Sequence, residues 1–426
     1  MKKVLIITYY WPPAGGPGVQ RWLKFVKYLK DFNIEPIVYI PENPDYPMLD
    51  NSLEKEVPKD ITILKGKIFE PYFLAKIFSK KDTSKISSGI IVDEKKQSSL
   101  QKLMLYVRGN FFIPDARKFW VKPSVSFLSN YISENNIETV ITTGPPHSVH
   151  LIGLKLKQQL KVEWLADFRD PWTQIGYHDK LRLSDSSKRK HLALEKEVLN
   201  NADKIIVTSF TTKSEFTKIT NKPIAVITNG YDTVSEDVEI IEENKFTLSH
   251  IGSLLSGRNP LVLWKCLNEM VSENEQFAKD FNLKLIGAVS EDVINSIKEY
   301  KLEDYLEISG YVPHKEALKI QRSASVLLLI EINSGDTKGI IPGKLFEYMA
   351  AKRPILAIGP PDWDVIQILN KTNSGVAFEY NDSEKLKNYI QQLYHLYKEN
   401  KLHSMSHDID QYSRKSLTKQ LVELLN

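Results

Sequence analysis

The chain has only one cysteine, Cys266, among its 426 residues. A single thiol excludes an internal disulfide framework and a cysteine-based zinc cluster, and it is typical of a reducing cytoplasm. Long apolar runs are also lacking. The N-terminal run after Lys2 and Lys3 extends for only about seven residues, too short for a signal-peptide core or a membrane span. We therefore expect a cytoplasmic protein that begins with a strand.

An excess of one charge is lacking as well. Lys and Arg number 57 against 53 Asp and Glu, for a net charge of +4. No run of Lys and Arg gathers this small excess on one element, so we expect no nucleic-acid partner. Repeats of fixed period are absent. A chain of this length with 42% hydrophobic residues is expected to form two domains.

Apolar, β-rich runs recur along the chain with helical patterns between them. They are continuous rather than alternating, which is typical of parallel strands covered on both faces. The predicted strands are 4–10, 35–40, 61–64, 139–143, 162–168, 204–209, 224–228, 246–252, 283–287, 306–310, 326–331, 354–359 and 375–378. Two successive series of this kind predict an α/β chain with two doubly wound domains.

The boundary between the domains is predicted at the Asn-Gly turn in "ITNGYD" (227–232). We expect an N-terminal domain over 1–228, with a polar insertion at about 78–102, and a C-terminal domain over 229–408. Leucines on one stripe of the last segment, 409–426, predict a helix that packs back toward the N-terminal domain.

A glycine-rich turn follows the first predicted strand. Gly15, Gly16 and Gly18 stand immediately before a helical pattern. Glycines in a strand-to-helix turn let a ligand approach the backbone and the helix N-terminus, although a tight turn without a ligand is an alternative. The spacing is not that of the dinucleotide-binding fingerprint.

A second candidate site is the segment "KGIIPGKLFEYMAAKRPILAIGPP" (338–361). Pro342 suits the first position of a helix, and Gly343 leaves the approach open. The N–H groups of Gly343, Lys344 and Leu345 are then expected to be free donors beside the Lys344 charge, which suits a phosphate. Glu347 lies on the same helix face as Lys344 and can accept hydrogen bonds from a vicinal diol. The alternative is a solvated Lys–Glu pair.

Taken together, the motifs resemble those of the family 4 glycosyltransferases, and the resemblance covers nearly the whole chain. The stretches that carry it, in order, are "TYYWPPAGGPGVQR" (8–21), "DFRDPW" (167–172), "NGYD" (229–232), "HIGSLLSGRNP" (250–260), "GYVPHKEA" (310–317), "PGKLFEYMAAKRPIL" (342–356) and "YSRKSLTKQLVELL" (412–425). The resemblance implies the GT-B fold, in which two Rossmann-like domains face each other across a cleft. It also implies transfer of a sugar, with retention, from a nucleotide-sugar to a glycan or lipid-linked glycan in cell-surface polysaccharide synthesis.

The resemblance further implies a donor site on the C-terminal domain. Arg258 and Lys344 would contact the diphosphate, with Gly343 and Leu345 at the helix start. Backbone groups around Val312 and His314 would receive the base. Glu347 would hold the ribose, and Gly15 and Gly16 would approach the phosphate from the other domain.

One position departs from the family pattern, because Gly339 stands where a first glutamate is usual. This departure leaves open which residue recognises the hydroxyls of the donor sugar. Asp336, in the same loop, is a candidate to replace the missing glutamate. The resemblance also implies that the leaving diphosphate deprotonates the acceptor, and Arg258 and Lys344 suit the task of stabilising its charge. With two cations in this role, no metal and no other cofactor are expected.

Candidates on the acceptor side come from the N-terminal domain. His147 opens a helix after a strand, and it is either a catalytic side chain or a satisfied structural group. Asp167, Arg169 and Asp170 cluster after the strand 162–168, at the end of a strand where α/β domains bind ligands. An internal Arg–Asp pair is the structural alternative.

The segment 103–123 mixes basic and aromatic residues, namely Arg108, Phe111, Phe112, Arg117, Lys118, Phe119, Trp120 and Lys122. Such a mixture suits peripheral contact with the inner membrane surface, while burial of the aromatic side chains is the alternative. Two other functions stay open: a nucleotide-sugar 2-epimerase of the same fold, and a non-catalytic glycosyltransferase-like subunit that binds a partner enzyme.

Overall fold

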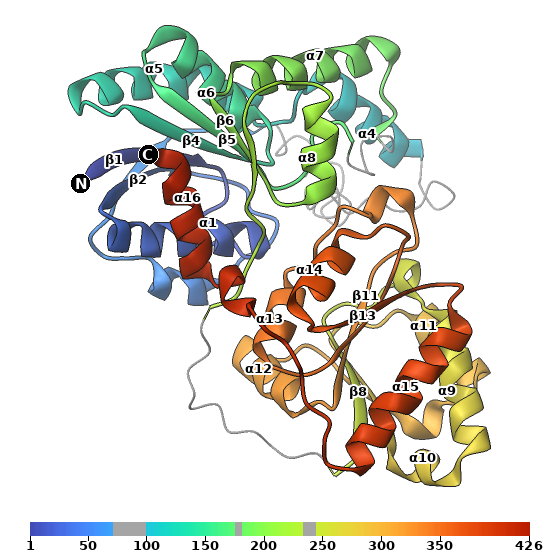
Figure 1. The fold of residues 1–426 in the computed structure, drawn as a ribbon. Helices are drawn as coiled ribbons and strands as arrows, with labels where there is room; N and C mark the ends of the chain where they lie inside the picture. The colour runs from blue at the N-terminus through green and yellow to red at the C-terminus, as the bar shows by residue number, and fades with distance from the viewer. Residues whose placement is uncertain (71–98, 175–180, 233–243) are drawn as a thin grey trace. The chain divides into compact units, whose positions relative to one another are not determined.

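The computed structural model describes residues 1–70, 99–174, 181–232 and 244–426. The chain divides into two compact units, one of Met1–Asn229 with Arg414–Asn426 and one of Gly230–Ser413 (Figure 1). Most of the insertion predicted at 78–102 lies outside the described residues. Its last residues belong to a helix that begins at Ser99.

Unit 1 is built on a seven-stranded parallel sheet of order β3-β2-β1-β4-β5-β6-β7. Its strands are β1 (Lys2–Thr8), β2 (Ile34–Pro41), β3 (Thr62–Gly66), β4 (Thr139–Gly144), β5 (Glu163–Phe168), β6 (Lys204–Val207) and β7 (Ile224–Val226). Its helices are α1 (Pro17–Leu29), α4 (Ser99–Phe111), α5 (Lys118–Glu134), α6 (Ser148–Gln159), α7 (Asp185–Asn201), α8 (Phe210–Thr217) and α16 (Arg414–Leu425).

Both faces of this sheet are covered, as the continuous apolar runs require. In β1, Leu5 and Ile7 belong to the core that includes α5 and α6. Val4 and Ile6 belong to the core on the other face, which includes α1 and α16. Figure 1 shows α16, in red, alongside α1, in dark blue. The C-terminal segment thus completes the core of unit 1 from Arg414 onward, whereas the 3₁₀ turn η8 (Ile409–Tyr412) belongs to unit 2.

Unit 2 is built on a six-stranded parallel sheet of order β10-β9-β8-β11-β12-β13. Its strands are β8 (Phe246–Ile251), β9 (Phe281–Ile286), β10 (Leu306–Ser309), β11 (Val326–Ile330), β12 (Ile355–Gly359) and β13 (Gly375–Glu379). Its helices are α9 (Leu261–Glu273), α10 (Glu275–Asp280), α11 (Glu291–Glu299), α12 (His314–Ser323), α13 (Lys344–Ala350), α14 (Asp364–Thr372) and α15 (Ser383–Lys398). The prediction of two parallel α/β domains is confirmed.

Candidate functional site

Asp167, at the carboxyl end of β5, is fully buried in unit 1. Its carboxylate accepts hydrogen bonds from Arg21 Nη2 at 2.9 Å, Trp22 Nε1 at 2.8 Å and Thr143 Oγ1 at 2.8 Å. Burial acts to raise the pKa of Asp167, but the Arg21 charge and these donors hold it below its ordinary value. All of these contacts are internal, which favours the structural alternative. They tie β5 to α1 and β4.

Arg169 links the predicted cluster in "DFRDPW" (167–172) to the glycine-rich turn, because its side chain lies against that turn. Its Nε donates to the carbonyl of Gly144 at 3.2 Å, and its Nη2 donates to Pro145. A Cβ added at Gly18 would lie 1.9 Å from Arg169 Nη1. A side chain at position 18 would therefore displace the Arg169 guanidinium from its present place.

The other two glycines of the turn, Gly15 and Gly16, differ in conformation and in contacts. Gly16 has a φ of +106°, a conformation that favours glycine, and it precedes α1. The Gly15 N–H donates to the Met48 carbonyl at 3.0 Å. Asp170, the last residue of the predicted cluster, is exposed.

His147 is buried at the start of α6, with 6% of its surface exposed. Its ring stacks on Trp172 with the centroids 4.9 Å apart and an interplanar angle of 3°. The His147 ring also lies 6.1 Å from that of Phe168. These contacts fix the ring as part of the packing after β4 and β5.

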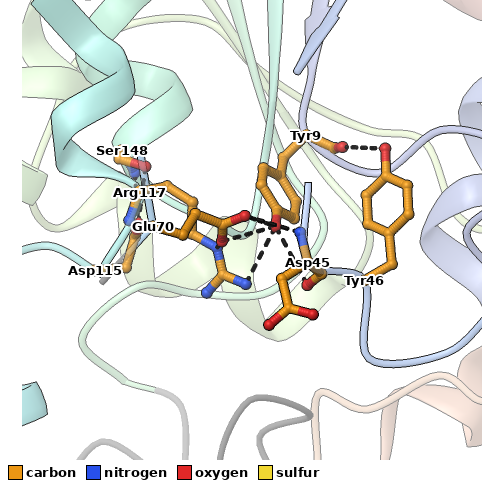
Figure 2. Close-up of polar contacts among 7 residues, drawn as sticks. All are labelled: Tyr9, Asp45, Tyr46, Glu70, Asp115, Arg117 and Ser148. Carbon is orange, nitrogen blue, oxygen red and sulfur yellow. Dashed lines mark hydrogen bonds and ion pairs between the residues drawn. The ribbon is translucent and has the colours of Figure 1, made fainter. Parts of the chain in front are cut away.

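A further polar cluster of unit 1 surrounds Tyr9 (Figure 2). The Tyr9 hydroxyl donates to Glu70 at 2.8 Å, and Arg117 Nε lies 3.0 Å from Glu70 Oε1. The Arg117 guanidinium carbon lies 4.7 Å from the centre of the Tyr9 ring. Nearby, Asp115 accepts from the Ser148 N–H at 2.8 Å and so caps α6. Arg117, one of the basic residues of the segment 103–123, is therefore part of the interior.

In unit 2, Arg258 and Glu331 form a bidentate ion pair. Arg258 Nε donates to Glu331 Oε1 at 3.0 Å, and Nη2 lies 2.8 Å from the same oxygen and 3.2 Å from Oε2. The Glu331 side chain is 1% exposed, while that of Arg258 is 30% exposed. Glu331 thus orients the guanidinium, and Nη1 is its one nitrogen with no hydrogen bond to the described residues.

Lys344 lies in the same charged cluster. Its Nζ is 3.3 Å from Nε2 of the fully buried His250. Because His250 Nδ1 lies 3.0 Å from the Leu328 carbonyl, which can only accept, Nδ1 carries the proton and Nε2 accepts from Lys344. Burial, aided by the Lys344 charge, lowers the pKa of His250 to about 3, so the ring is neutral.

Burial and the Arg258 charge lower the pKa of Lys344 to about 8, against the opposing effect of Glu331 and Glu347. The position of Lys344 is set by the next turn of α13, where Tyr348 accepts from the Ile251 N–H at 2.9 Å. A Cβ at Gly252 would lie 2.7 Å from Lys344 Nζ. Gly252, with a φ of +119°, therefore leaves the room that Lys344 occupies.

The start of α13 differs from the sequence prediction. The helix begins at Lys344, two residues later than the position predicted from Pro342. The prediction that the Leu345 N–H is free is wrong, because it donates to the Pro342 carbonyl at 3.0 Å. In the described part of the chain, the N–H groups of Gly343 and Lys344 have no acceptor. The positive charge here thus comes mainly from side chains.

Glu347 lies between two donors on α12. Its Oε1 is 3.2 Å from His314 Nε2, and its Oε2 accepts from Gln321 Nε2 at 3.2 Å. The backbone of Val312, two residues before α12, makes no hydrogen bond within the described ranges. Asp336, the proposed substitute for the missing glutamate, is exposed in the 3₁₀ turn η7 (Gly335–Thr337).

Sequence reasoning missed three of these residues: His250, Glu331 and Gln321. Glu331 had a signal, since a carboxylate directly after the apolar run of β11 stands at the ligand-binding edge of a parallel sheet. His250 had a weaker signal, because it opens the quoted stretch "HIGSLLSGRNP", but a histidine inside a strand is usually a satisfied core residue.

Comparison with known proteins gives structural matches only. No family model and no curated protein matches the sequence. A glycosyltransferase from Rickettsia africae matches with a TM-score of 0.58 and 16% identity, covering 99% of this chain and 97% of that one. Anabaena HepE, solved in complex with UDP-glucose, matches with a TM-score of 0.58 and 13% identity, over 100% and 99%. The lipopolysaccharide outer core galactosyltransferase WaaB matches with a TM-score of 0.57 and 13% identity, over 100% and 99%.

The chain has the GT-B fold. Its two parallel sheets, of seven and six strands, and the full-length matches to glycosyltransferases agree on this point. At these identities, the fold alone is shared. Within the described ranges, no three His, Cys, Asp or Glu side chains gather as a metal site.

Proposed function

We propose that the chain is a retaining glycosyltransferase that moves a sugar from a nucleotide-sugar to a glycan or lipid-linked glycan acceptor in cell-surface polysaccharide synthesis. The observation that carries this proposal is the pair of cations in unit 2. Lys344 is held beside Arg258 despite the cost of burying its charge, and a bound diphosphate would offset that cost. The UDP-glucose bound by Anabaena HepE, which shares the fold, supports a donor of this class.

The donor-binding roles follow from the groups that are left available. Arg258 Nη1 and Lys344 Nζ would bind the diphosphate, together with the Gly343 N–H. Backbone groups at Val312 would receive the base. Glu347, which already accepts from His314 and Gln321, would accept from the ribose hydroxyls.

The reaction exchanges one bond at the anomeric carbon for another. The bond from this carbon to the diphosphate oxygen breaks, and a bond to the acceptor oxygen forms on the same face. The acceptor proton passes to the departing diphosphate. Arg258 and Lys344 would stabilise the charge that grows on the leaving group, which is how preorganised cations accelerate such a step.

The acceptor side of the proposal lies in unit 1. Arg169 and Asp170, which follow β5, are the proposed acceptor residues. Gly15 and Gly16, predicted to bind the donor, lie in a turn without side chains at the same edge of the sheet. His147 and Asp167 are buried, so we assign them to holding these loops rather than to contact with the acceptor.

Nucleotide-sugar binding by Glu347→Ala tests the donor site. We expect weaker binding in a variant that still folds. His314 can turn to solvent, but Gln321 is only 1% exposed and loses its acceptor, so a stability loss of about 1–3 kcal/mol is expected and binding is measured where the variant is fully folded. Calorimetric titration with a panel of nucleotide-sugars measures the effect. Glu384→Ala, an exposed glutamate on α15, is the matched control. Wild-type affinity in Glu347→Ala would remove this residue from the site.

The same panel of nucleotide-sugars separates the transferase from the two alternative functions, an epimerase and a non-catalytic subunit. Release of nucleotide that depends on a membrane extract as acceptor source supports the transferase. Interconversion of nucleotide-sugars without acceptor would indicate an epimerase. Binding without turnover under any acceptor would indicate a non-catalytic subunit, an alternative that Gly339 keeps open.

The pH dependence of turnover tests the state of Lys344. Its pKa of about 8 means that the ammonium is present below this value and lost above it, so kcat/KM is expected to fall as pH rises through about 8. Lys344→Arg keeps a positive charge, so the alkaline fall should disappear even if the overall rate is lower. Lys338→Arg, at an exposed lysine in the preceding loop, should keep the wild-type profile. An alkaline fall that persists in Lys344→Arg would assign it to another group.

A further inference from the structure

The outward face of α4 carries large apolar side chains where a surface helix normally carries polar ones. Leu105 and Gly109 face inward, and a Cβ at Gly109 would lie 2.6 Å from Leu183. Asn110 secures this contact, because its Oδ1 accepts from the Ser184 N–H at 2.8 Å. The helix is therefore docked on the segment before α7, and its opposite side is free of these contacts.

This opposite side is the α4 apolar face, defined as Leu103, Tyr106, Val107 and Phe111. The spacing of these residues places them on one stripe of the helix. Leu103 is 58% exposed and Phe111 is 64% exposed. A contiguous exposed apolar stripe of this kind indicates an interaction surface rather than ordinary surface variation.

Aromatic side chains of the α4–α5 connection and of the first turn of α5 continue the stripe. The Phe112 and Phe119 rings are 6.2 Å apart, and Phe119 is exposed. Lys118 Nζ lies 5.4 and 5.2 Å from the centres of these two rings and donates to the Phe111 carbonyl at 2.6 Å. The apolar surface thus has a cation fixed at its edge.

The charges around this surface are almost all positive. Between residues 99 and 133 there are five basic residues and one acidic residue, Asp115. Asp115 is occupied in capping α6, and Arg117 is buried. The cations on which the argument rests are Lys102 on α4 and Lys118 and Lys122 at the start of α5.

We propose that the α4 apolar face and these cations bind the surface of an anionic lipid bilayer. Apolar and aromatic side chains entering the headgroup boundary, with lysines at the edge, are the pattern of an interfacial helix. A second copy of the chain fits less well, because a two-fold contact would place these cations against their own equivalents. In the described part of the chain, no helix is long and apolar enough to span the bilayer, so the contact is peripheral.

The proposal deepens the proposed function, since a lipid-linked acceptor lies at a bilayer, but lipid binding needs neither donor nor turnover. The test is co-sedimentation of the full chain with vesicles of phosphatidylcholine, with or without phosphatidylglycerol. We expect binding that requires phosphatidylglycerol and weakens as salt is raised. Leu103→Asp/Phe111→Asp should lower partitioning by roughly tenfold or more, from the burial of two large apolar side chains.

Two further variants test whether the effect is specific to the α4 apolar face and whether the cations contribute. Met405→Asp, at an exposed apolar side chain of unit 2, should bind as the wild type does. Lys102→Gln/Lys122→Gln leaves the apolar stripe intact and should weaken partitioning by roughly thirtyfold, on the basis of about 1 kcal/mol for each of the two cations. Its melting temperature should be unchanged, which covers the case in which the aspartate variant fails to fold.

Three outcomes would overturn the proposal. One is the absence of binding to anionic vesicles by the wild type. Another is equal binding by Leu103→Asp/Phe111→Asp or by the lysine variant. The third is a lipid-free dimer, seen by sedimentation velocity, that the aspartate variant abolishes, because it would assign the face to a second copy. If the wild type binds vesicles but has no transferase activity, only the proposed function is contradicted.

Discussion

Replacing Lys344 by alanine is expected to lower kcat far more than it weakens donor binding. A cation that stabilises a leaving diphosphate acts mainly in the transition state, and its removal costs roughly 2–4 kcal/mol of transition-state stabilisation. Nearly all of the loss should appear in kcat, since Arg258 still contacts the ground-state diphosphate. Steady-state kinetics with the best nucleotide-sugar of the panel measures the effect.

The controls for this variant separate chemistry from folding. Lys344→Ala leaves His250 Nε2 without its donor, so a stability loss of about 1–3 kcal/mol is expected alongside the kinetic one. Kinetics at a temperature where the variant is fully folded removes that contribution. Lys338→Ala, at an exposed lysine six residues earlier, should retain wild-type kcat. Unchanged kcat in Lys344→Ala would exclude this side chain from the reaction.

Replacing Asp167 by asparagine is expected to destabilise unit 1 strongly. The change removes the charge that balances Arg21, a side chain only 1% exposed, and breaking a buried ion pair of this kind costs about 3–5 kcal/mol. For a unit of this size we expect the melting temperature to fall by roughly 10 °C. Thermal unfolding followed by circular dichroism measures the change.

Asp170→Asn is the matched control, because Asp170 lies three residues later and is exposed. Its melting temperature should stay close to that of the wild type. Donor binding by unit 2 should also survive in Asp167→Asn at temperatures where the variant is folded. A stable Asp167→Asn that has lost only acceptor turnover would instead show that this carboxylate acts on the substrate.

The strands were predictable because burial on both faces leaves a direct trace in the sequence. The continuous apolar runs at β1, β8 and β11 each form a parallel strand, and the turns that follow them supply the site residues. Gly16 was also predictable as a turn residue, and its positive φ gives the reason.

The contacts that organise the site were not predictable, because they join residues far apart in the sequence. Lys344 and His250 are 94 positions apart, and Arg21 and Asp167 are 146 apart. The sequence suggested an Arg–Asp pair within "DFRDPW", whereas Asp167 pairs with an arginine of α1. The start of α13 was misplaced because Pro342 suits a first helical position but equally suits the turn before it.

The aromatic and basic segment 103–123 was partly predictable. Burial of Trp120 and Arg117 agrees with the packing alternative, while exposure of Phe111 and Phe119 agrees with the surface alternative. A single helical period could not separate them, because α4 ends at Phe111 and α5 begins at Lys118, so the segment is not one helix. Exposed Phe119 and buried Trp120 are neighbours on α5.

The central claim is that Lys344 and Arg258 hold the diphosphate of a nucleotide-sugar. A crystal structure with a bound nucleoside diphosphate tests it most directly. We predict phosphate oxygens within hydrogen-bond distance of Lys344 Nζ and Arg258 Nη1, with the Arg258–Glu331 pair retained. A diphosphate bound elsewhere, with Lys344 still directed only at His250, would contradict the account.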